Sequence, residues 1–297
     1  MSRKYRSSSP QHAQAAHGRI LIYSGITLLI TTVIAALIFT GRVIAYDATG
    51  QIQSDRDEQI AATYSQQLKS AKFTAAKKYN QSLAHHPLTV SLDLDRNYMG
   101  TRHYQSLLNA PNSVMATLRI PKIGVNLPVY HGASKTVLEE GLGHLPGTAL
   151  PIGGAGNRPV IVGHRGLPGK TLFTRLNELT RGDLIYITVL GKTLAYRVTV
   201  STTVSPSNLT AIRPQHDKDL LTLLTCTPYG VNTQRLLVTG ERIPYQTNTL
   251  PHIPNTWQWI PPTISGIIVT TACPIIGHIF RIRPQGLHIL IGHKKHQ

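Results

Sequence analysis

Leu223-Leu224-Thr225-Cys226-Thr227-Pro228-Tyr229-Gly230 is the stretch that decides the fold of this 297-residue chain. The apolar run from Leu220 to Leu224 is typical of a buried strand, and the Pro-Tyr-Gly sequence that follows is typical of a turn. One of the chain's two cysteines stands where the run and the turn meet. We therefore expect Cys226 at the edge of a sheet, beside a loop, where a substrate can reach it.

Cys226 alone does not define a function, because cysteines outside disulfides are usually small buried packing residues. A cysteine becomes a nucleophile only as a thiolate, which a neighbouring cation favours. Two residues in the same half of the chain could provide that environment. His164 stands between glycines just after an apolar run, and Arg235 opens the apolar run that follows Cys226. Together the three residues predict a thiol active site.

Three segments around these residues resemble the signature segments of the sortases, the cysteine transpeptidases of Gram-positive cell surfaces. They are TLLTCTPYG (222–230), GHRGLPG (163–169) and NTQRLLVTGERI (232–243). The resemblance continues through ATLRIPKIGVNLPVYHG (116–132) and GLGHLPGTALPIGG (141–154). All five segments occur in the family's order, between Val114 and Tyr245. The detailed pattern is similar to class C, the pilus-assembling sortases.

Short apolar runs separated by glycine and proline begin at Val114. They predict strands at Met115–Ile120, Val125–Tyr130, Pro159–Gly163, Leu184–Leu190, Leu194–Val204, Leu220–Thr225 and Leu236–Ile243. Regularly spaced short strands favour a sandwich or a barrel. The resemblance implies a mainly β fold, the eight-stranded sortase β-barrel with short flanking helices. We expect two of these helices at Lys135–Gly141 and Lys170–Leu179.

The formal net charge of +17 could serve binding to nucleic acid or to an anionic surface. The positive residues are spread along the chain, no nucleic-acid motif is present, and only four Phe and two Trp could stack on bases. We therefore expect no nucleic acid as a partner and an attraction to an anionic membrane and wall instead. Neither a Cys-x-x-Cys pair nor a histidine cluster has the spacing of a metal site, so we expect no metal and no cofactor.

The N-terminal region predicts a membrane anchor. Residues 1–19 form a basic tail, expected to be disordered, and residues 20–40 are apolar without a charge. A stretch of about 20 apolar residues is long enough to cross a bilayer. A signal peptide is the alternative, but its apolar region would be shorter and would end in a cleavage site of small residues. We expect an uncleaved transmembrane helix, with the basic tail in the cytoplasm and the catalytic domain outside the cell.

Residues 41–113 are expected to form an extracellular helical stalk and a candidate lid. Ser54–Leu83 predicts a helix, because an apolar face recurs at helical spacing, made of Ile60, Tyr64, Leu68, Ala71, Ala75 and Tyr79. The resemblance implies a lid within 85–112, with an Asp-Pro-aromatic motif that plugs the active site. Its nearest match is His86-Pro87-Leu88, which lacks both the carboxylate and the aromatic ring. A plain linker therefore stays open as the alternative.

The sortase barrel is expected to span residues 114–245, and a linker, residues 246–259, follows it. Residues 260–280 form a second apolar stretch, which prolines and glycines interrupt. We favour a second transmembrane helix here over a buried hairpin or an interfacial segment. The basic tail of residues 281–297 would then return to the cytoplasm, in agreement with the positive-inside rule.

The resemblance also implies what the three site residues do. Cys226 attacks the carbonyl of the Thr–Gly bond in an LPXTG-like sorting signal and forms a thioacyl-enzyme. His164 acts as general acid and base, and Arg235 holds the substrate or the oxyanion. Arginine cannot act as a base, but its donors suit either task.

Further residues are given smaller roles. We expect His144, Thr225 and Thr227 to support the site, and His131 to be structural. Asp183 follows Arg181-Gly182 and precedes an apolar run, so it is predicted to be a turn residue and not the acid of a triad.

An amine must resolve the thioacyl-enzyme. In a class C enzyme this is a pilin lysine, and in a housekeeping enzyme it comes from a cell-wall precursor. The second apolar stretch and the long segment before the barrel favour pili. A non-enzymatic β-domain tethered to the membrane is the other alternative, and it predicts no special reactivity at Cys226. We expect a monomer whose partners are the membrane and surface proteins or pilins that carry a C-terminal sorting signal.

Overall fold

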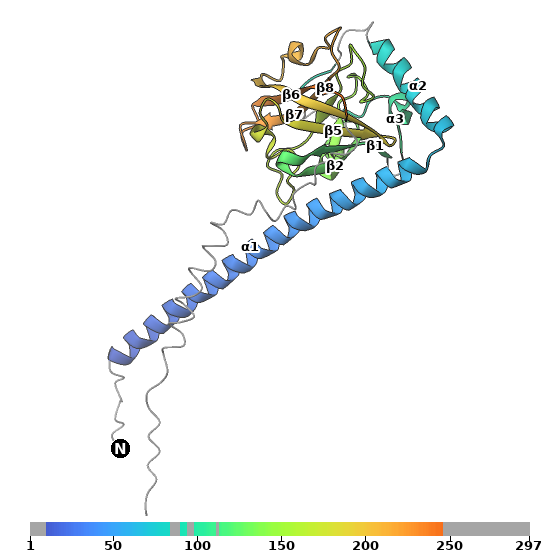
Figure 1. Cartoon of the computed structure of the whole chain (residues 1–297). Coiled ribbons are helices and arrows are strands. Elements are labelled where there is room, and N and C mark those ends of the chain that lie inside the picture. Colours follow the sequence, from blue (N-terminus) through green and yellow to red (C-terminus); the bar gives the residue numbers. More distant parts are fainter. Residues whose placement is uncertain (1–9, 84–89, 94–97, 111–112, 246–297) are drawn as a thin grey trace, which may run out of the picture. The chain divides into compact units, whose positions relative to one another are not determined.

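The structure is a computed structural model, which describes residues 10–83, 90–93, 98–110 and 113–245. Eight strands close into a barrel in the order β1-β2-β3-β4-β7-β8-β6-β5 (Figure 1). The strands are β1 (Val114–Ile120), β2 (Val125–His131), β3 (Leu142–His144), β4 (Val160–Val162), β5 (Leu184–Val189), β6 (Lys192–Val204), β7 (Leu220–Thr227) and β8 (Gln234–Ile243). The predicted mainly β, eight-stranded barrel is confirmed.

Two of the strand pairs are parallel, β2 with β3 and β4 with β7, and the others are antiparallel. All seven strands predicted from apolar runs are present. The eighth, β3, was not predicted, because a Leu-Gly-His segment of three residues is too short to show a period of two. It is inserted between β2 and β4 by its pairing with both.

The barrel interior is filled by aliphatic side chains from every side of the sheet. β7 is buried at each position from Leu220 to Thr225. A strand that is covered on both faces reads as a continuous apolar run and does not alternate. This explains why the run before Cys226 is so apolar, and it makes β7 the central strand on which the site is built.

The N-terminal helix α1 spans Pro10–Thr63. It begins inside the tail that was expected to be disordered, and it continues without interruption through the expected membrane span into the stalk. Among the described residues it is the one helix long and apolar enough to cross a membrane. Its large apolar side chains are exposed, for example Leu28, Leu37 and Phe39. The part of α1 up to Ile34 belongs to a different compact unit from Ala35–Thr256, which contains the barrel.

The single helix predicted over Ser54–Leu83 is wrong, because the chain breaks after Thr63 and restarts as α2 (Gln66–Leu83). Ser65 causes the restart: its Oγ accepts a hydrogen bond of 3.2 Å from the backbone N–H of Leu68, as in an N-cap. The break also changes which side chains face the barrel. Leu68, predicted to be on the apolar face, is exposed, and Ala76 is buried instead.

Polar contacts fasten both helices to the barrel. In α1, Asp55 and Glu58 form ion pairs of 2.8 and 3.1 Å with Arg119 of β1. In α2, the amide of Asn80 donates to the carbonyl of Leu150 at 3.1 Å and accepts from its N–H at 2.7 Å. Because Asn80 and its partner are buried, this pair of bonds fixes α2 against the β3–β4 connection.

The remaining helices are short: α3 (Arg102–Ser106), α4 (Lys135–Glu140) and the 3-10 turns η2 (Pro121–Ile123), η3 (Leu176–Glu178) and η4 (Leu209–Ile212). The helix predicted at Lys135–Gly141 is confirmed by α4. The one predicted at Lys170–Leu179 is reduced to η3. Leu172 has a φ of 39°, in the left-handed region, which a right-handed helix cannot include.

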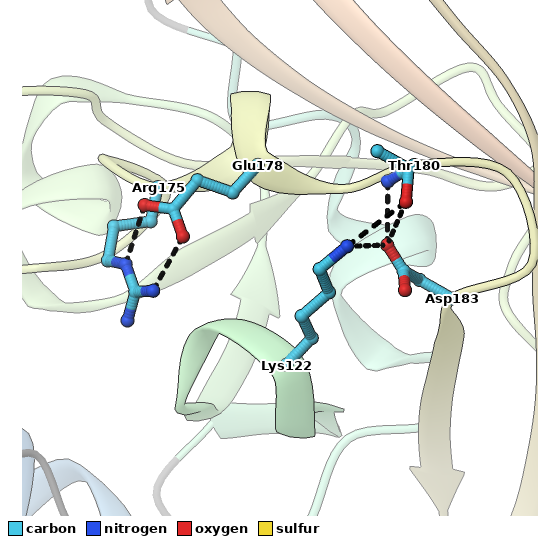
Figure 2. Close-up of polar contacts among 5 residues, drawn as sticks. All are labelled: Lys122, Arg175, Glu178, Thr180 and Asp183. Carbon is cyan, nitrogen blue, oxygen red and sulfur yellow. Dashed lines mark hydrogen bonds and ion pairs between the residues drawn. The ribbon is translucent and has the colours of Figure 1, made fainter. Parts of the chain in front are cut away.

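Figure 2 shows the turn that leads from η3 into β5. The Asp183 carboxylate accepts hydrogen bonds from the Thr180 N–H at 2.6 Å and from Lys122 Nζ at 2.7 Å. Arg175 and Glu178 form a separate pair nearby, with a contact of 2.5 Å. Asp183 is therefore a turn residue, as predicted. The expected linker, second membrane span and C-terminal tail, residues 246–297, lie outside the described residues.

Candidate functional site

Cys226 is the penultimate residue of β7, where burial of the strand ends. The six residues before it are buried, whereas the Cys226 thiol is half-buried and the chain turns directly afterwards. The predicted placement of this cysteine at the edge of the sheet is confirmed.

Arg235 lies directly opposite Cys226. β7 and β8 pair antiparallel in a register that places Cys226 beside Arg235 and Thr225 beside Leu236. Residues that face each other in this way have Cβ atoms about 5 Å apart and project to the same side of the sheet. The register therefore brings the guanidinium to the face that carries the thiol.

His164 reaches the same edge from β4. The parallel pairing of β4 and β7 ends at Val162 and Leu224, and His164 and Cys226 each follow two residues later. The two chains stay together beyond the last pair, because Gly163 N donates to Leu224 O at 3.1 Å and Thr225 Oγ1 donates to Gly163 O at 2.7 Å. The structure thus brings the three predicted site residues to one end of three adjacent strands.

Burial is the main influence on the pKa of His164 and lowers it below the usual histidine value. The Glu139 carboxylate of α4 raises this pKa, and Lys135 and Lys170 lower it further. Because the net direction is downward, the ring is mostly neutral at pH 7. A neutral imidazole can accept a proton and later return it.

The side chain of Arg235 is buried and held from three directions. Its Nη1 donates to the carbonyls of Asn232 at 2.8 Å and Gln234 at 3.0 Å, within its own turn. Its Nε donates to the backbone carbonyl of Leu92 at 2.6 Å, and its Nη2 lies 4.0 Å from the Asp93 carboxylate. A distant part of the chain therefore occupies donors that a substrate carbonyl could use.

This part of the chain, Val90–Asp93, is called here the 90–93 segment. Leu92 is fully buried among side chains of the strands that carry the site, including Val162, Leu224 and Leu237. The candidate lid predicted at His86-Pro87-Leu88 lies outside the described residues. Leu92 and Asp93 were not predicted, because the lid motif expected in this region was Asp-Pro-aromatic, and Asp93 is followed by neither a proline nor an aromatic residue.

Two predicted supporting residues contact the loop that carries His164. Thr225 bonds to Gly163, as described above, and Thr227 Oγ1 accepts a hydrogen bond of 2.9 Å from Arg165 Nη1. Arg165 also donates from Nη2 to Asn177 Oδ1 at 3.0 Å. Arg165 was not predicted as a site residue. Its position next to His164 in the sequence is the signal that could have identified it.

Close packing fixes the two loops that flank the site. Gly163 lies against Phe173, so that a Cβ added to it would come within 2.7 Å of the ring, and Phe173 N donates to His164 O at 3.0 Å. Gly166 has a φ of 79° and lies equally close to the Tyr229 ring, which belongs to the turn after Cys226. A residue with a side chain would be strained at this positive φ and would clash with the Tyr229 ring, so this position requires glycine.

The histidines of β2 and β3 lie in a buried network. His144 Nε2 lies 2.8 Å from the carbonyl of Ala149, so this nitrogen carries the proton, and its Nδ1 accepts from Tyr104 Oη at 2.8 Å. His131 Nε2 donates to Leu107 O at 2.6 Å. Burial lowers the pKa of His144 to about 4. These contacts are structural, as predicted for His131, and the support that His144 provides is to the packing of α3 on the barrel.

The arrangement combines a thiol, a neutral imidazole and a buried guanidinium. Groups of these three types can act as a nucleophile, a proton carrier and a donor for a developing oxyanion, the set that acyl transfer through a thioester requires. In the described part of the chain, no group of three or more His, Cys, Asp or Glu side chains could hold a metal ion.

Comparison with known proteins agrees with this geometry. The family model described as "Sortase domain" matches residues 118–243. Sortase C-1 from Actinomyces oris is 42% identical, with a TM-score of 0.56, and the match covers 59% of this chain and 98% of that one. Sortase C from Streptococcus pneumoniae is 35% identical, with a TM-score of 0.61 and coverage of 65% and 97%.

Sortase D of Bacillus subtilis (strain 168) is 31% identical over 129 residues, which are 42% of this chain and 62% of the relative. The matched part thus spans less than two thirds of this curated relative. The two class C structures, in contrast, are matched over almost their whole length. The chain therefore belongs to the sortase family of cysteine transpeptidases, and these structural relatives are of class C.

Proposed function

We propose that this chain cleaves an LPXTG-like sorting signal between Thr and Gly and transfers the acyl group to a pilin lysine. The observation that carries the proposal is the strand register at the barrel edge, which places Arg235 opposite Cys226 and brings His164 beside the end of β7. The similarity to class C sortases supports the choice of a pilin. One of these relatives, Streptococcus pneumoniae Sortase C, is described in connection with pilin substrate specificity.

In the proposed first step, the Cys226 sulfur attacks the Thr carbonyl carbon, and the guanidinium of Arg235 donates to the oxygen as it becomes negative. His164 holds the proton that came from the thiol and gives it to the departing glycine amine. The C–N bond breaks and a thioester with Cys226 remains. No oxidant or cofactor takes part in this exchange of one acyl bond for another.

In the second step, a neutral lysine amine attacks the thioester carbonyl. His164 takes the proton that the amine loses and returns it to the Cys226 sulfur, which leaves as the amide bond forms. The product is an isopeptide bond, and the thiol is regenerated. The mechanism is therefore ping-pong, with one acyl group bound to Cys226 between the two substrates.

We further propose that the 90–93 segment represents a closed form of the site. Its support is that Leu92 and Asp93 engage Nε and Nη2 of Arg235, the donors that the reaction assigns to the substrate or the oxyanion. The segment must then move away before the sorting signal can bind. The Asp93 carboxylate near the guanidinium is in keeping with the acidic residue of the lid that class C sortases carry, whereas the 90–93 segment contains neither the proline nor the aromatic ring of that motif.

We propose that α1 anchors the protein in the membrane with the barrel outside the cell. The support is the length and the apolar composition of this helix, and the exposure of its large apolar side chains between Ile22 and Phe39. Substrates that are themselves held at the same membrane would meet the site at a raised effective concentration. A carbonate wash and protease accessibility of the barrel in intact cells would test the anchor and its orientation.

The decisive experiment is intact-mass analysis of the full chain in a non-ionic detergent with an LPXTG peptide. We expect an adduct that corresponds to the peptide without its glycine-side fragment, on wild type but not on Cys226→Ala. His164→Ala and Arg235→Ala should give much less adduct while they retain the folded circular dichroism spectrum. Adduct formation that is equal in Cys226→Ala would refute the assignment of the nucleophile.

The acceptor is tested separately, because adduct formation does not depend on it. A pilin with a reactive lysine should remove the acyl group from Cys226 and give an isopeptide product, and the matching Lys→Arg pilin should not. Transfer to a cell-wall precursor peptide in preference to the pilin would overturn pilus polymerisation in favour of wall anchoring.

A further inference from the structure

A cavity of about 1600 Å³ lies between α2 and the barrel. Its walls are one face of α2, the β3–β4 connection from Gly147 to Arg158, Lys192 of the β5–β6 hairpin, and the β6–β7 connection around Arg213. None of the residues that hold Cys226, His164 and Arg235 in place belongs to these walls. Its volume exceeds that of most pockets that bind small molecules, which is about 300–1,000 Å³.

Arg158 lies in the wall of this cavity and is buried, with 6% of its surface exposed. Its Nε donates to Thr222 Oγ1 at 2.8 Å, its Nη1 to Arg213 O at 3.0 Å, and its Nη2 to Thr239 Oγ1 at 2.9 Å. Each of these bonds uses one N–H, so that two of the five guanidinium N–H groups bond to no described residue.

Arg158 has no carboxylate partner within the described part of the chain. All three of its acceptors are neutral oxygens. Burial without a counter-charge lowers the pKa of this guanidinium to about 10, yet the group stays charged at pH 7. Burying a charge without a counter-ion is costly. An anion in the cavity would remove that cost, because its oxygens could accept the two unused N–H groups.

The cavity walls add more positive charge. Lys77 from α2, Lys192 from the β5–β6 hairpin and Arg213 also line it, and no described lining residue is an Asp or a Glu. His216 lies at the rim, where its exposed ring contacts the exposed carboxylate of Asp217 at 2.9 Å. The nearby Asp219 lies behind the glycine loop, where Gly154 N and Tyr196 Oη donate to its two oxygens at 2.7 and 3.0 Å. The Asp219 carboxylate is thus hydrogen-bonded within the cavity wall, and it also attracts Lys192.

We propose that this cavity binds the phosphate group of a phosphate-bearing ligand, with Arg158 as the central contact. A guanidinium presents parallel N–H donors that match phosphate oxygens. Three further cations suit an anion with more than one negative charge better than a single carboxylate. Apolar walls from Phe73, Ile152, Leu209 and Ile212 provide space for an apolar part of the same molecule.

The position of the site relative to the thiol follows from the strands. Thr222 and Thr239, which hold Arg158, are a cross-strand pair on β7 and β8, four residues before Cys226 and four after Arg235. At about 3.3 Å per residue, the anion site lies roughly 13 Å from Cys226 along β7. Arg158 precedes β4 and His164 follows it, so the two sites lie at opposite ends of that strand. This inference is independent of the proposed acyl transfer.

Binding is tested with the full Cys226→Ala chain in dodecyl maltoside, a detergent without phosphate. Isothermal titration calorimetry at constant ionic strength would compare inorganic phosphate, pyrophosphate and dihexanoyl phosphatidic acid. We expect one saturable site. Tighter binding of the phosphatidic acid than of inorganic phosphate assigns the site to a lipid headgroup, and equal binding assigns it to a free phosphate.

Variants at the cavity wall identify the site. Loss of charge-assisted hydrogen bonds should weaken binding by about tenfold or more in Arg158→Gln. Lys77→Ala and Arg213→Ala, both exposed, should each weaken it by about two- to fivefold. The matched control is Lys78→Ala, the next residue of α2, which does not line this cavity and should bind like the parent.

Arg158→Gln removes a buried group and its folding must be checked by circular dichroism. If it unfolds, the Lys77→Ala/Arg213→Ala double variant decides, because both side chains are at the surface. Absence of saturable phosphate binding to the parent chain would overturn the proposal. So would a double variant that binds phosphate as tightly as the Lys78→Ala control.

Discussion

The backbone carbonyl of Leu92 accepts a hydrogen bond of 2.6 Å from Nε of Arg235, the residue directly opposite the candidate nucleophile Cys226. The side chain of Leu92 is at the same time fully buried beside Leu224 and Leu237. Leu92 thus fills apolar space with its side chain, and with its carbonyl it occupies the Arg235 N–H that the proposed mechanism assigns to the substrate or the oxyanion. Both contacts must be lost before a substrate carbonyl can replace that of Leu92.

Truncating Leu92 should therefore open the site. Leu→Ala changes in well-packed positions cost about 2–5 kcal/mol, and 1.4 kcal/mol corresponds to a factor of ten in an equilibrium. Since the lost packing belongs only to the closed form, we expect iodoacetamide to alkylate Cys226 at least about tenfold faster in Leu92→Ala. The rate is measured by intact mass at 25 °C.

Leu68→Ala is the matched control, because Leu68 is exposed on α2 and does not belong to the apolar cluster that holds Leu92. Its alkylation rate should equal that of wild type. Asp93→Asn should raise the rate by less than Leu92→Ala, since its contact with Arg235 is long and its side chain is 41% exposed. An unchanged rate in Leu92→Ala would show that the 90–93 segment does not limit access to the thiol.

The sequence predicted the three central residues because each is marked locally. Cys226, His164 and Arg235 all stand at an end of an apolar run, and runs of this kind identify strands without knowledge of their partners. Their meeting at one edge could be expected only through the family resemblance, since the order of strands in the barrel is a property of the whole chain.

The contact between Leu92 and Arg235 could not be predicted in the same way, because it joins residues 143 positions apart. Nor does periodicity reveal the break at Ser65, since apolar residues keep helical spacing on both sides of it. Ser65 is a good N-cap by type, but serine is also common within helices. The proposed phosphate-binding cavity is formed by four segments that meet only in the fold, so no single stretch of the sequence points to it.

Arg165 should act as a positioning residue for the site. It joins the loop of His164 to Thr227, the neighbour of Cys226, through a bond of 2.9 Å. Arg165→Gln loses this bond and the one to Asn177, and hydrogen bonds of charged groups contribute about 1.5–3 kcal/mol. We expect kcat for thioester formation to fall by about tenfold, with little change in KM, because the substrate is still bound.

A double-mutant cycle with Thr227→Val separates positioning from general destabilisation. If the two side chains act through their mutual bond, the double variant should be hardly slower than Arg165→Gln alone. Arg175→Ala is the control, since it removes an arginine of the same connection, one that pairs with Glu178 (Figure 2). Fully additive losses would contradict the role given to Arg165.

The charges on α4 should adjust the titration of His164. Glu139 raises the pKa of this ring, so Glu139→Gln should lower it. Lys135 and Lys170 act in the opposite direction, and Lys135→Ala should raise it. The imidazole carbon resonance of His164, followed by NMR between pH 4 and 8, measures these shifts directly.

Glu140→Gln is the matched control for Glu139→Gln, because it removes the same charge from the next residue of α4. Glu140 is not among the groups that act on the His164 pKa. A titration curve that moves equally in both variants would mean that net charge, and not the position of Glu139, sets the pKa of His164.

Acid should destabilise the barrel through His144. Its folded pKa is about 4, below the usual value near 6.5, because the ring is fully buried. A depressed pKa means that the unfolded chain binds the proton more readily than the folded one. The contribution to stability is therefore complete above pH 6.5 and is lost as the pH falls toward 4. The loss from this group is on the order of 3 kcal/mol.

Urea unfolding of the full chain in detergent at pH 7 and at pH 4.5 measures the effect. In wild type we expect a lower free energy of unfolding at pH 4.5. His144→Gln should be less stable than wild type at pH 7, since it disturbs the bonds to Tyr104 and Ala149. It should lose less stability on acidification, because an amide does not titrate. Equal losses in the two proteins would place the acid sensitivity at other groups, such as His131, whose pKa burial also lowers.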